Sequence, residues 1–153
     1  MVKIVIKNME NKKSTREVAK QLLIRQLADH NVNVKIDGNL ILIEDPTKLI
    51  SYSIHFCSTK GPSHAGGKGR LHLKWSIKEN IEADIYALID LSGKRTWLFN
   101  KKEIKEVSQQ HNNNTNHLYM FVDRMAPNPQ NKSHYYVAEF NKWLLPNKIS
   151  SIF

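Results

Sequence analysis

The chain has 153 residues, of which 41% are hydrophobic and 24% charged, a composition typical of an ordinary soluble globular domain. Its formal net charge is +9, which favours an acidic partner, nucleic acid first and an acidic protein second. Cys57 is the only cysteine, which excludes an intrachain disulfide and a thiolate-rich metal cage, and no apolar run is long enough to span a bilayer. We therefore expect a single cytoplasmic domain over residues 1–153, with no membrane contact.

The N-terminal region predicts an arm followed by a helix. Residues 1–13 begin with alternating apolar and basic side chains and end in a polar stretch, a pattern that indicates an extended arm and a linker. Ser14 and Glu17 have the spacing of a capping box, in which the serine hydroxyl accepts a hydrogen bond from the glutamate N–H. A helix is therefore expected from Ser14 to about His30, with its apolar residues on one face.

Three strands are expected next, over residues 32–36, 40–44 and 49–57. Asp37 and Gly38 are expected to form a two-residue turn that joins the first two strands as a hairpin. The third strand alternates apolar and polar residues along its length. One of its faces should therefore belong to the core, and the other to a site or a surface.

Residues 60–70 are rich in glycine and basic side chains, which is typical of a flexible loop. No acidic residue lies between Asp45 and Glu79, although lysine, arginine and histidine recur through that interval. The glycine spacing matches no nucleotide-binding motif, so the loop is expected to follow a nucleic-acid backbone or to close on a partner. The residues predicted to contact nucleic acid are Lys60, Ser63, His64, Lys68, Arg70, His72 and Lys74.

The middle of the chain predicts further buried strands. A strand over residues 71–75 should place Trp75 in the core, and a short helical turn is expected at 76–81. Residues 83–91 are almost continuously apolar, which indicates a strand that is buried on both faces. Another strand is expected at 96–99.

The C-terminal third predicts two helices separated by polar segments. Asn100 has the position of an N-cap for a helix that ends near Gln110. The stretch HNNNTNH at 111–117 could suggest a metal site or an HNH nuclease motif, but its spacing does not match the HNH motif, and an asparagine run is expected to be a polar loop. Pro146 is expected to end the last helix. The remaining expected elements are a strand at 117–122, a loop at 125–132, a helix at 136–145 and an apolar tail at 146–153.

The order of these elements, together with three segments, resembles the PD-(D/E)xK nuclease-like superfamily. The segments are IHFCSTKG at 54–61, WSIKENIEADIYALIDL at 75–91 and TWLFNKKEI at 96–104. The resemblance runs over residues 14–145 and lies in pattern and order more than in identity. It implies an α/β (α+β) fold of restriction-endonuclease type, a single domain in which helices flank a central mixed β-sheet.

The positions that carry the active site of that family hold other residues in this chain. The resemblance places the metal-binding Asp at Asn39, the Glu at His55 and the Lys at Cys57. Asn39 lacks the charge, His55 favours softer metals than Mg²⁺, and Cys57 carries no permanent cation. The resemblance therefore implies a nuclease-like scaffold without the standard active site, a metal or a cofactor. An active Mg²⁺ enzyme would need a relocated site drawn from Glu17, Glu44, Asp45 and Lys60.

Three functions follow as alternatives. The first is a basic nucleic-acid-binding protein, with DNA as the first choice, on a catalytically degenerate endonuclease-like scaffold. The second is an active metal-dependent endonuclease with relocated residues, which the loss of three key side chains disfavours. The third is an immunity or antirestriction protein that binds an acidic protein, for which Tyr135 and Tyr136 are expected to supply exposed aromatic contacts.

Overall fold

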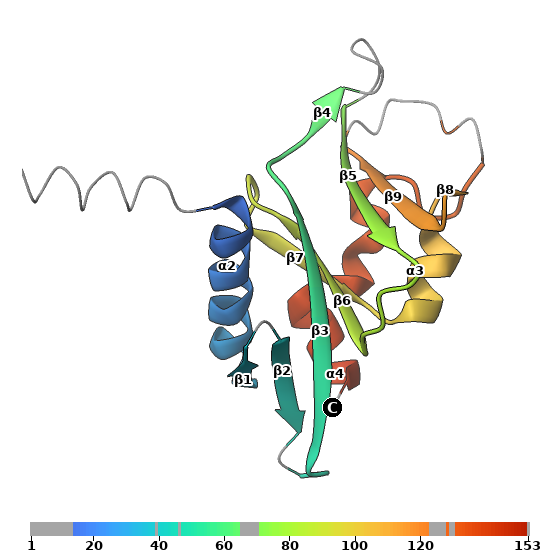
Figure 1. The fold of residues 1–153 in the computed structure, drawn as a ribbon. Helices are drawn as coiled ribbons and strands as arrows, with labels where there is room; N and C mark the ends of the chain where they lie inside the picture. The colour runs from blue at the N-terminus through green and yellow to red at the C-terminus, as the bar shows by residue number, and fades with distance from the viewer. Residues whose placement is uncertain are drawn as a thin grey trace, which may run out of the picture.

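A five-stranded mixed sheet, sheet A, lies at the centre of the computed structural model (Figure 1). Its strand order is β1-β2-β3-β6-β7, with β3 and β6 parallel and the other neighbours antiparallel. β6 is buried along its whole length, as expected for an apolar run in a sheet that is covered on both faces. The bounds are β1 Asn33–Asp37, β2 Leu40–Asp45, β3 Ile50–Thr59, β6 Ile85–Asp90 and β7 Arg95–Phe99.

Several parts of the chain are outside the described structure. The predicted arm at 1–13 lies outside the described residues, as do the site candidates Asn39, Lys68 and Arg70. The predicted loop at 60–70 is described only as far as residue 64. The structure describes residues 14–38, 40–45, 47–64, 71–122, 128 and 131–152.

A second, fully antiparallel sheet, sheet B, has the order β4-β5-β9-β8. Its inner face packs on one face of sheet A, and the two inner faces share a core that contains Trp75 and Leu118 from sheet B with Leu88 and Trp97 from sheet A. Trp75 is therefore a core residue, as the sequence predicts, and its indole N–H donates to the carbonyl of Ile89 at 3.1 Å. The bounds are β4 Ser63–His64, β5 Leu71–Lys78, β8 Gln110–Asn112 and β9 Thr115–Phe121.

Helices cover both faces of sheet A. α2 (Thr15–Asp29) and α4 (Leu145–Ile152) pack on the face that carries Ile54 and Ala87, and they form a second core there. α3 (Lys101–Val107) and the 3₁₀ helix η2 (Val137–Trp143) lie with sheet B against the other face. Figure 1 shows α2 on the opposite side of sheet A from α3, β8 and β9. The fold is therefore α/β, with a mixed central sheet flanked by helices, as predicted.

Capping residues fix the ends of two helices. The hydroxyl of Ser14 accepts from the N–H of Glu17 at 3.1 Å, which confirms the predicted start of α2. Asn100 and Glu103 form a reciprocal capping box at the start of α3. The Glu103 carboxylate also accepts from the indole of Trp143 at 2.8 Å and from the ammonium of Lys148 at 3.0 Å. This one carboxylate therefore ties α3 to η2 and α4.

Asp90, at the end of β6, is a second buried carboxylate with a bracing role. It has no exposed surface, and it accepts from the N–H and hydroxyl of Ser92 at 3.1 and 2.7 Å and from the guanidinium of Arg95 at 3.0 Å. A buried carboxylate is tolerated only with such partners. Asp90 therefore holds the tight turn between β6 and β7.

Four local expectations differ from the structure. β5 continues to Lys78, so the helical turn expected at 76–81 is absent. Residues 111–117 form a hairpin of β8 and β9 in place of a polar loop. Pro146 lies in the first turn of α4, where proline is tolerated, so it opens a helix where it was expected to end one. The expected tail is accordingly helical as far as Ile152, with Ile149 and Ile152 against the core.

Two smaller expectations also change. Asp37 pairs with Leu40, so the turn between β1 and β2 begins one residue later than predicted, and Gly38 takes a φ of +61°, which glycine adopts without steric cost. Tyr135 is 3% exposed and stacks on Phe121, so it supplies no exposed contact surface.

None of the described helices is both long and apolar enough to cross a membrane.

Candidate functional site

His55 and Cys57 lie on β3, on the face of sheet A that packs against sheet B. The Nε2 atom of His55 is 3.5 Å from the Sγ atom of Cys57, so the two side chains are in contact. β2 begins at Leu40, next to the Ile41–Ile54 pair, so β3 runs past the start of β2 at this point. Two of the positions implied by the nuclease resemblance, His55 and Cys57, therefore lie together on β3 near the start of β2.

Both side chains are held in their neutral forms. Burial lowers the pKa of His55, and the guanidinium of Arg16 lowers it further. Burial raises the pKa of the Cys57 thiol from 9.0 to about 11, although Arg16 acts in the opposite direction. A neutral imidazole and a neutral thiol therefore stand where the resemblance implies a carboxylate and a lysine.

Arg16 is a component of this region that the sequence pattern did not single out. Its guanidinium lies 4.3 Å from the centroid of the Phe56 ring, and it lines a small pocket of about 150 Å³ with His55 and Glu82. The Glu82 carboxylate forms an ion pair with Lys101. The position of Arg16 follows from α2 packing against β3, which no local sequence signal reveals.

The residues expected for a relocated site do not all lie together. Asp45 ends β2 opposite the start of β3, and its carboxylate accepts from the N–H and hydroxyl of Thr47 at 3.0 and 2.7 Å. Glu44 is its neighbour on β2, whereas Lys60 follows the other end of β3, about 33 Å along that strand. Glu17 is in the first turn of α2. The structure therefore separates Glu44 and Asp45 from Lys60.

The donor set around His55 and Cys57 does not fit Mg²⁺. That ion requires hard oxygen ligands in an octahedral arrangement, whereas these two residues offer an imidazole nitrogen and a protonated thiol. Within the described ranges, no group of three or more His, Cys, Asp or Glu side chains could hold a metal ion. We therefore derive no metal-dependent step from this region.

A second candidate site is the outer face of sheet B, the face turned away from sheet A. Strands β4, β5, β8 and β9 contain no aspartate or glutamate, and the exposed side chains of Lys74 and Lys78 lie on this face. The antiparallel register places Lys74 opposite Tyr119, Ser76 opposite His117, and Lys78 opposite Thr115. The outer face therefore combines cations, aromatic rings and hydrogen-bonding groups without a carboxylate. Its central residues are Lys74, Ser76, Lys78, His117, Tyr119 and Phe121.

Aromatic contacts order the centre of this face. The ammonium of Lys74 lies 5.5 Å from the centroid of the Tyr119 ring, a cation–π contact. Tyr119 and Phe121 stack with centroids 6.3 Å apart and ring planes 23° apart, and the His72 ring lies 5.2 Å from Tyr119. The rings of β9 therefore stand side by side along the strand.

A network of side-chain hydrogen bonds lies beside Tyr119. The Ser76 hydroxyl is 2.9 Å from Nδ1 of His117, and Nε2 of His117 is 2.9 Å from Oδ1 of Asn112. The Tyr119 hydroxyl donates to Oε1 of Gln110 at 3.2 Å. Hydrogen bonds across three strands therefore fix the orientations of the His117 and Tyr119 rings.

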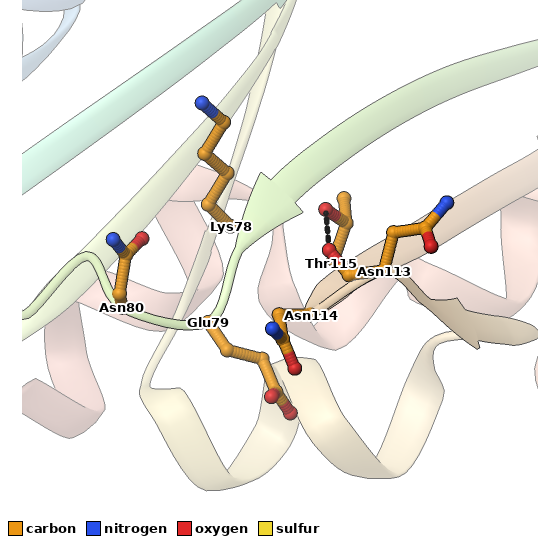
Figure 2. Close-up of a pocket in the computed structure, with 6 residues that line it drawn as sticks. All are labelled: Lys78, Glu79, Asn80, Asn113, Asn114 and Thr115. Atoms are coloured by element: carbon orange, nitrogen blue, oxygen red, sulfur yellow. Dashed lines mark hydrogen bonds between the residues drawn. The ribbon is translucent and has the colours of Figure 1, made fainter.

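A pocket of about 470 Å³ continues the outer face at the end of sheet B (Figure 2). Figure 2 shows Lys78, Glu79 and Asn80 on the β5 side, and Asn113, Asn114 and Thr115 on the side of the β8–β9 hairpin. The turn residues Asn113 and Asn114 have φ values of +51° and +56°, and asparagine is among the residues that tolerate this conformation best. Three carboxamides and one ammonium therefore line the pocket.

The single acidic side chain of this pocket is already engaged. The Glu79 carboxylate is 2.7 Å from Nε2 of His111, and the Glu79 N–H donates to the carbonyl of Asn114 at 2.9 Å. In Figure 2 the Glu79 side chain extends away from Lys78. The pocket therefore carries one ammonium, that of Lys78, and one carboxylate, that of Glu79, which points away from Lys78 and is bonded to His111 (Figure 2).

The described residues among those predicted to contact nucleic acid fall in three places. Ser63, His72 and Lys74 share the outer side of sheet B, since Ser63 pairs with His72 across β4 and β5, but His72 is only 5% exposed. His64 pairs with Leu71 at the next position, and Lys60 is exposed just before β4. The sequence pattern missed the second half of the face, on β8 and β9, because these residues join β5 only through tertiary pairing. The missed residues are Asn112, Asn113, Asn114, Thr115, His117 and Tyr119.

Comparisons with known proteins define the fold further. No protein-family model matches the chain, and no curated protein sequence matches it. Its structure is similar to that of the bacterial homing endonuclease I-Ssp6803I, with a TM-score of 0.54 and 10% sequence identity over 91% of both chains. At this identity the similarity shows a shared, nuclease-like fold.

Proposed function

We propose that this chain is a DNA-binding protein on a catalytically degenerate PD-(D/E)xK scaffold. The observation that carries the proposal is the outer face of sheet B, whose four strands hold no carboxylate and expose Lys74 and Lys78. Neutralising phosphates releases counterions from DNA, so a lysine-bearing face without acidic side chains favours a polyanion. The net charge of +9 acts in the same direction.

The His55–Cys57 pair supports binding without cleavage. Phosphodiester hydrolysis on such a scaffold needs carboxylates to hold Mg²⁺ and a cation beside the developing charge. His55 and Cys57 are neutral, so they provide no carboxylate that could hold Mg²⁺. The nearby guanidinium of Arg16 supplies a positive charge only. The fold shared with the homing endonuclease I-Ssp6803I supports the nuclease-like scaffold by analogy of architecture.

The test is a paired binding and cleavage assay on one preparation of the full chain. Duplex and single-stranded DNA are titrated across a salt series, with Mg²⁺ or Mn²⁺ present, and the DNA is analysed for strand breaks. We expect affinity to fall as salt rises and the DNA to stay intact. Cleavage that Asp45→Ala or Glu17→Ala abolishes would instead establish a relocated nuclease site.

Matched lysine variants locate the interface. Lys74→Gln with Lys78→Gln should lower the salt slope by about two, one for each lost phosphate contact. Lys35→Gln removes an exposed strand lysine from β1 of sheet A and should leave the slope unchanged. If both changes alter the slope equally, the interface does not lie on the outer face of sheet B. If the chain binds no DNA at low salt, the partner is expected to be an acidic protein.

A further inference from the structure

The outer face of sheet B and the pocket at its end form one continuous surface. Lys78 and Thr115 are paired at the last rung of sheet B and also line the pocket. Tyr119 lies four residues after Thr115, the residue of β9 that lines the pocket, a span of about 13 Å. About four stacked nucleotides of one strand cover that distance at 3.4 Å each. The surface therefore has the length to receive a short stretch of a nucleic-acid strand.

We propose that this surface binds unpaired nucleotides of a single-stranded nucleic acid, with a base stacked at Tyr119 and a base in the asparagine-lined pocket. The proposal rests on the proposed function and specifies the form of nucleic acid that the same face receives. Lys74 and Lys78 lie on β5 beside these two positions and meet the phosphates.

The aromatic contacts favour single strands over a duplex. Tyr119 is partly exposed, and its ring is held by Lys74, by Phe121 and by the hydroxyl bond to Gln110. A ring that is fixed in advance loses little entropy when a base stacks on it. Stacking requires an accessible base face, which a closed duplex does not present along its length.

The pocket supplies the contacts that a base edge needs. A volume of about 470 Å³ lies within the range of pockets that hold small ligands. Each carboxamide of Asn80, Asn113 and Asn114 offers a donor and an acceptor, which is the combination that pairs with the edge of a base. The Glu79 carboxylate also lines the pocket, but it is bonded to His111 and extends away from Lys78 (Figure 2), so the base is expected on the side of the amides and Lys78.

Charge complementarity selects an acidic occupant. The strands that form the face hold no carboxylate, so a basic peptide finds no charged partner on them, and the aromatic rings favour stacked bases over an acidic peptide. Alternating cations and rings are the arrangement that sequence-tolerant single-strand binders use. The chemistry is shared by single-stranded DNA and RNA, which the experiment separates.

The test compares fluorescein-labelled 12-nucleotide strands of DNA and of RNA with the matching DNA duplex, by fluorescence anisotropy on the full chain. Tyr119→Leu removes the ring and should weaken single-strand binding by about tenfold, within the range found for base–aromatic stacking. Tyr119→Phe keeps the ring and should stay within about twofold of the parent. Equal melting temperatures of the variants confirm that the sheet is intact.

A second pair of variants tests the pocket. Asn113→Asp with Asn114→Asp keeps residues that accept positive φ but replaces amide donors by repelling carboxylates, so single-strand affinity should fall by about tenfold or more. Asn31→Asp is the matched control, since Asn31 is an exposed asparagine with a φ of +60° after α2. It should leave the affinity unchanged.

The outcomes separate the two proposals. Salt-dependent duplex binding that is at least as tight as single-strand binding, and that Tyr119→Leu leaves unchanged, would overturn the single-strand inference and keep the proposed function. Single-strand affinity that is equal for Tyr119→Leu and Tyr119→Phe would also overturn it. Loss of binding to every probe at low salt would remove the proposed function itself. A higher affinity for the RNA strand would assign RNA as the ligand.

Discussion

The thiol of Cys57 should be unreactive in the native protein. Burial raises its pKa from 9.0 to about 11, so at neutral pH it forms about a hundredfold less thiolate than an ordinary cysteine. The thiolate is the form that reacts with alkylating agents, and Cys57 is the only cysteine in the chain. Alkylation of the native state should therefore be at least about a hundredfold slower than alkylation of the unfolded chain.

The measurement is the rate of iodoacetamide labelling by mass spectrometry between pH 7 and pH 10, in buffer and in guanidinium chloride. His55→Ala should leave native labelling slow, because the contact between His55 and Cys57 joins two neutral groups. The reasoning fails if native Cys57 labels rapidly at pH 7 and His55→Ala slows that reaction. Such a result would reveal a thiolate–imidazolium pair and with it a nucleophile on β3.

Three further outcomes are expected from single substitutions. Arg16→Gln removes the cation near His55, so an NMR titration should find the His55 pKa raised, and an unchanged value would place the guanidinium elsewhere. Burial raises the pKa of Glu103, but its hydrogen bonds outweigh that effect and leave the pKa below 4.5. The ionised Glu103 therefore contributes its full stabilisation above pH 4.5, and this contribution is lost as the pH falls further. Glu103→Gln should lower the free energy of unfolding, measured in urea, by about 1–3 kcal/mol at pH 7 and by less in acid. Asp90→Asn should lower the melting temperature by several degrees because Arg95 loses its partner, whereas an unchanged value would show that the β6–β7 turn needs no carboxylate.

Local patterns predicted the elements whose geometry is set by near neighbours. The Ser14–Glu17 spacing located the start of α2, and the apolar run before Asp90 located the buried strand β6. Helix caps and the periodicity of apolar residues depend on side chains that are close in sequence, so they can be recognised without knowledge of the fold. The alternation of β3 likewise placed His55 and Cys57 on one face.

Context changed the meaning of residues whose local signal is ambiguous. Pro146 suits either the end of a helix or its first turn, and only the η2–α4 junction selects the second. An asparagine run suits a loop or a tight turn, and the pairing of β8 with β9 selects the turn. Tyr135 is buried because it stacks on Phe121.

By itself the sequence indicated a basic α/β fold, the start of α2, the buried strand β6 and the common face of His55 and Cys57. Tertiary structure alone decided that Arg16 lies over the Phe56 ring and lines a pocket with His55, and that β5 meets β9. Ser76 and His117 are 41 positions apart, yet they share a hydrogen bond on the outer face of sheet B. Strand pairing between such distant segments depends on the packing of the whole core, so no local pattern encodes the surface that it creates.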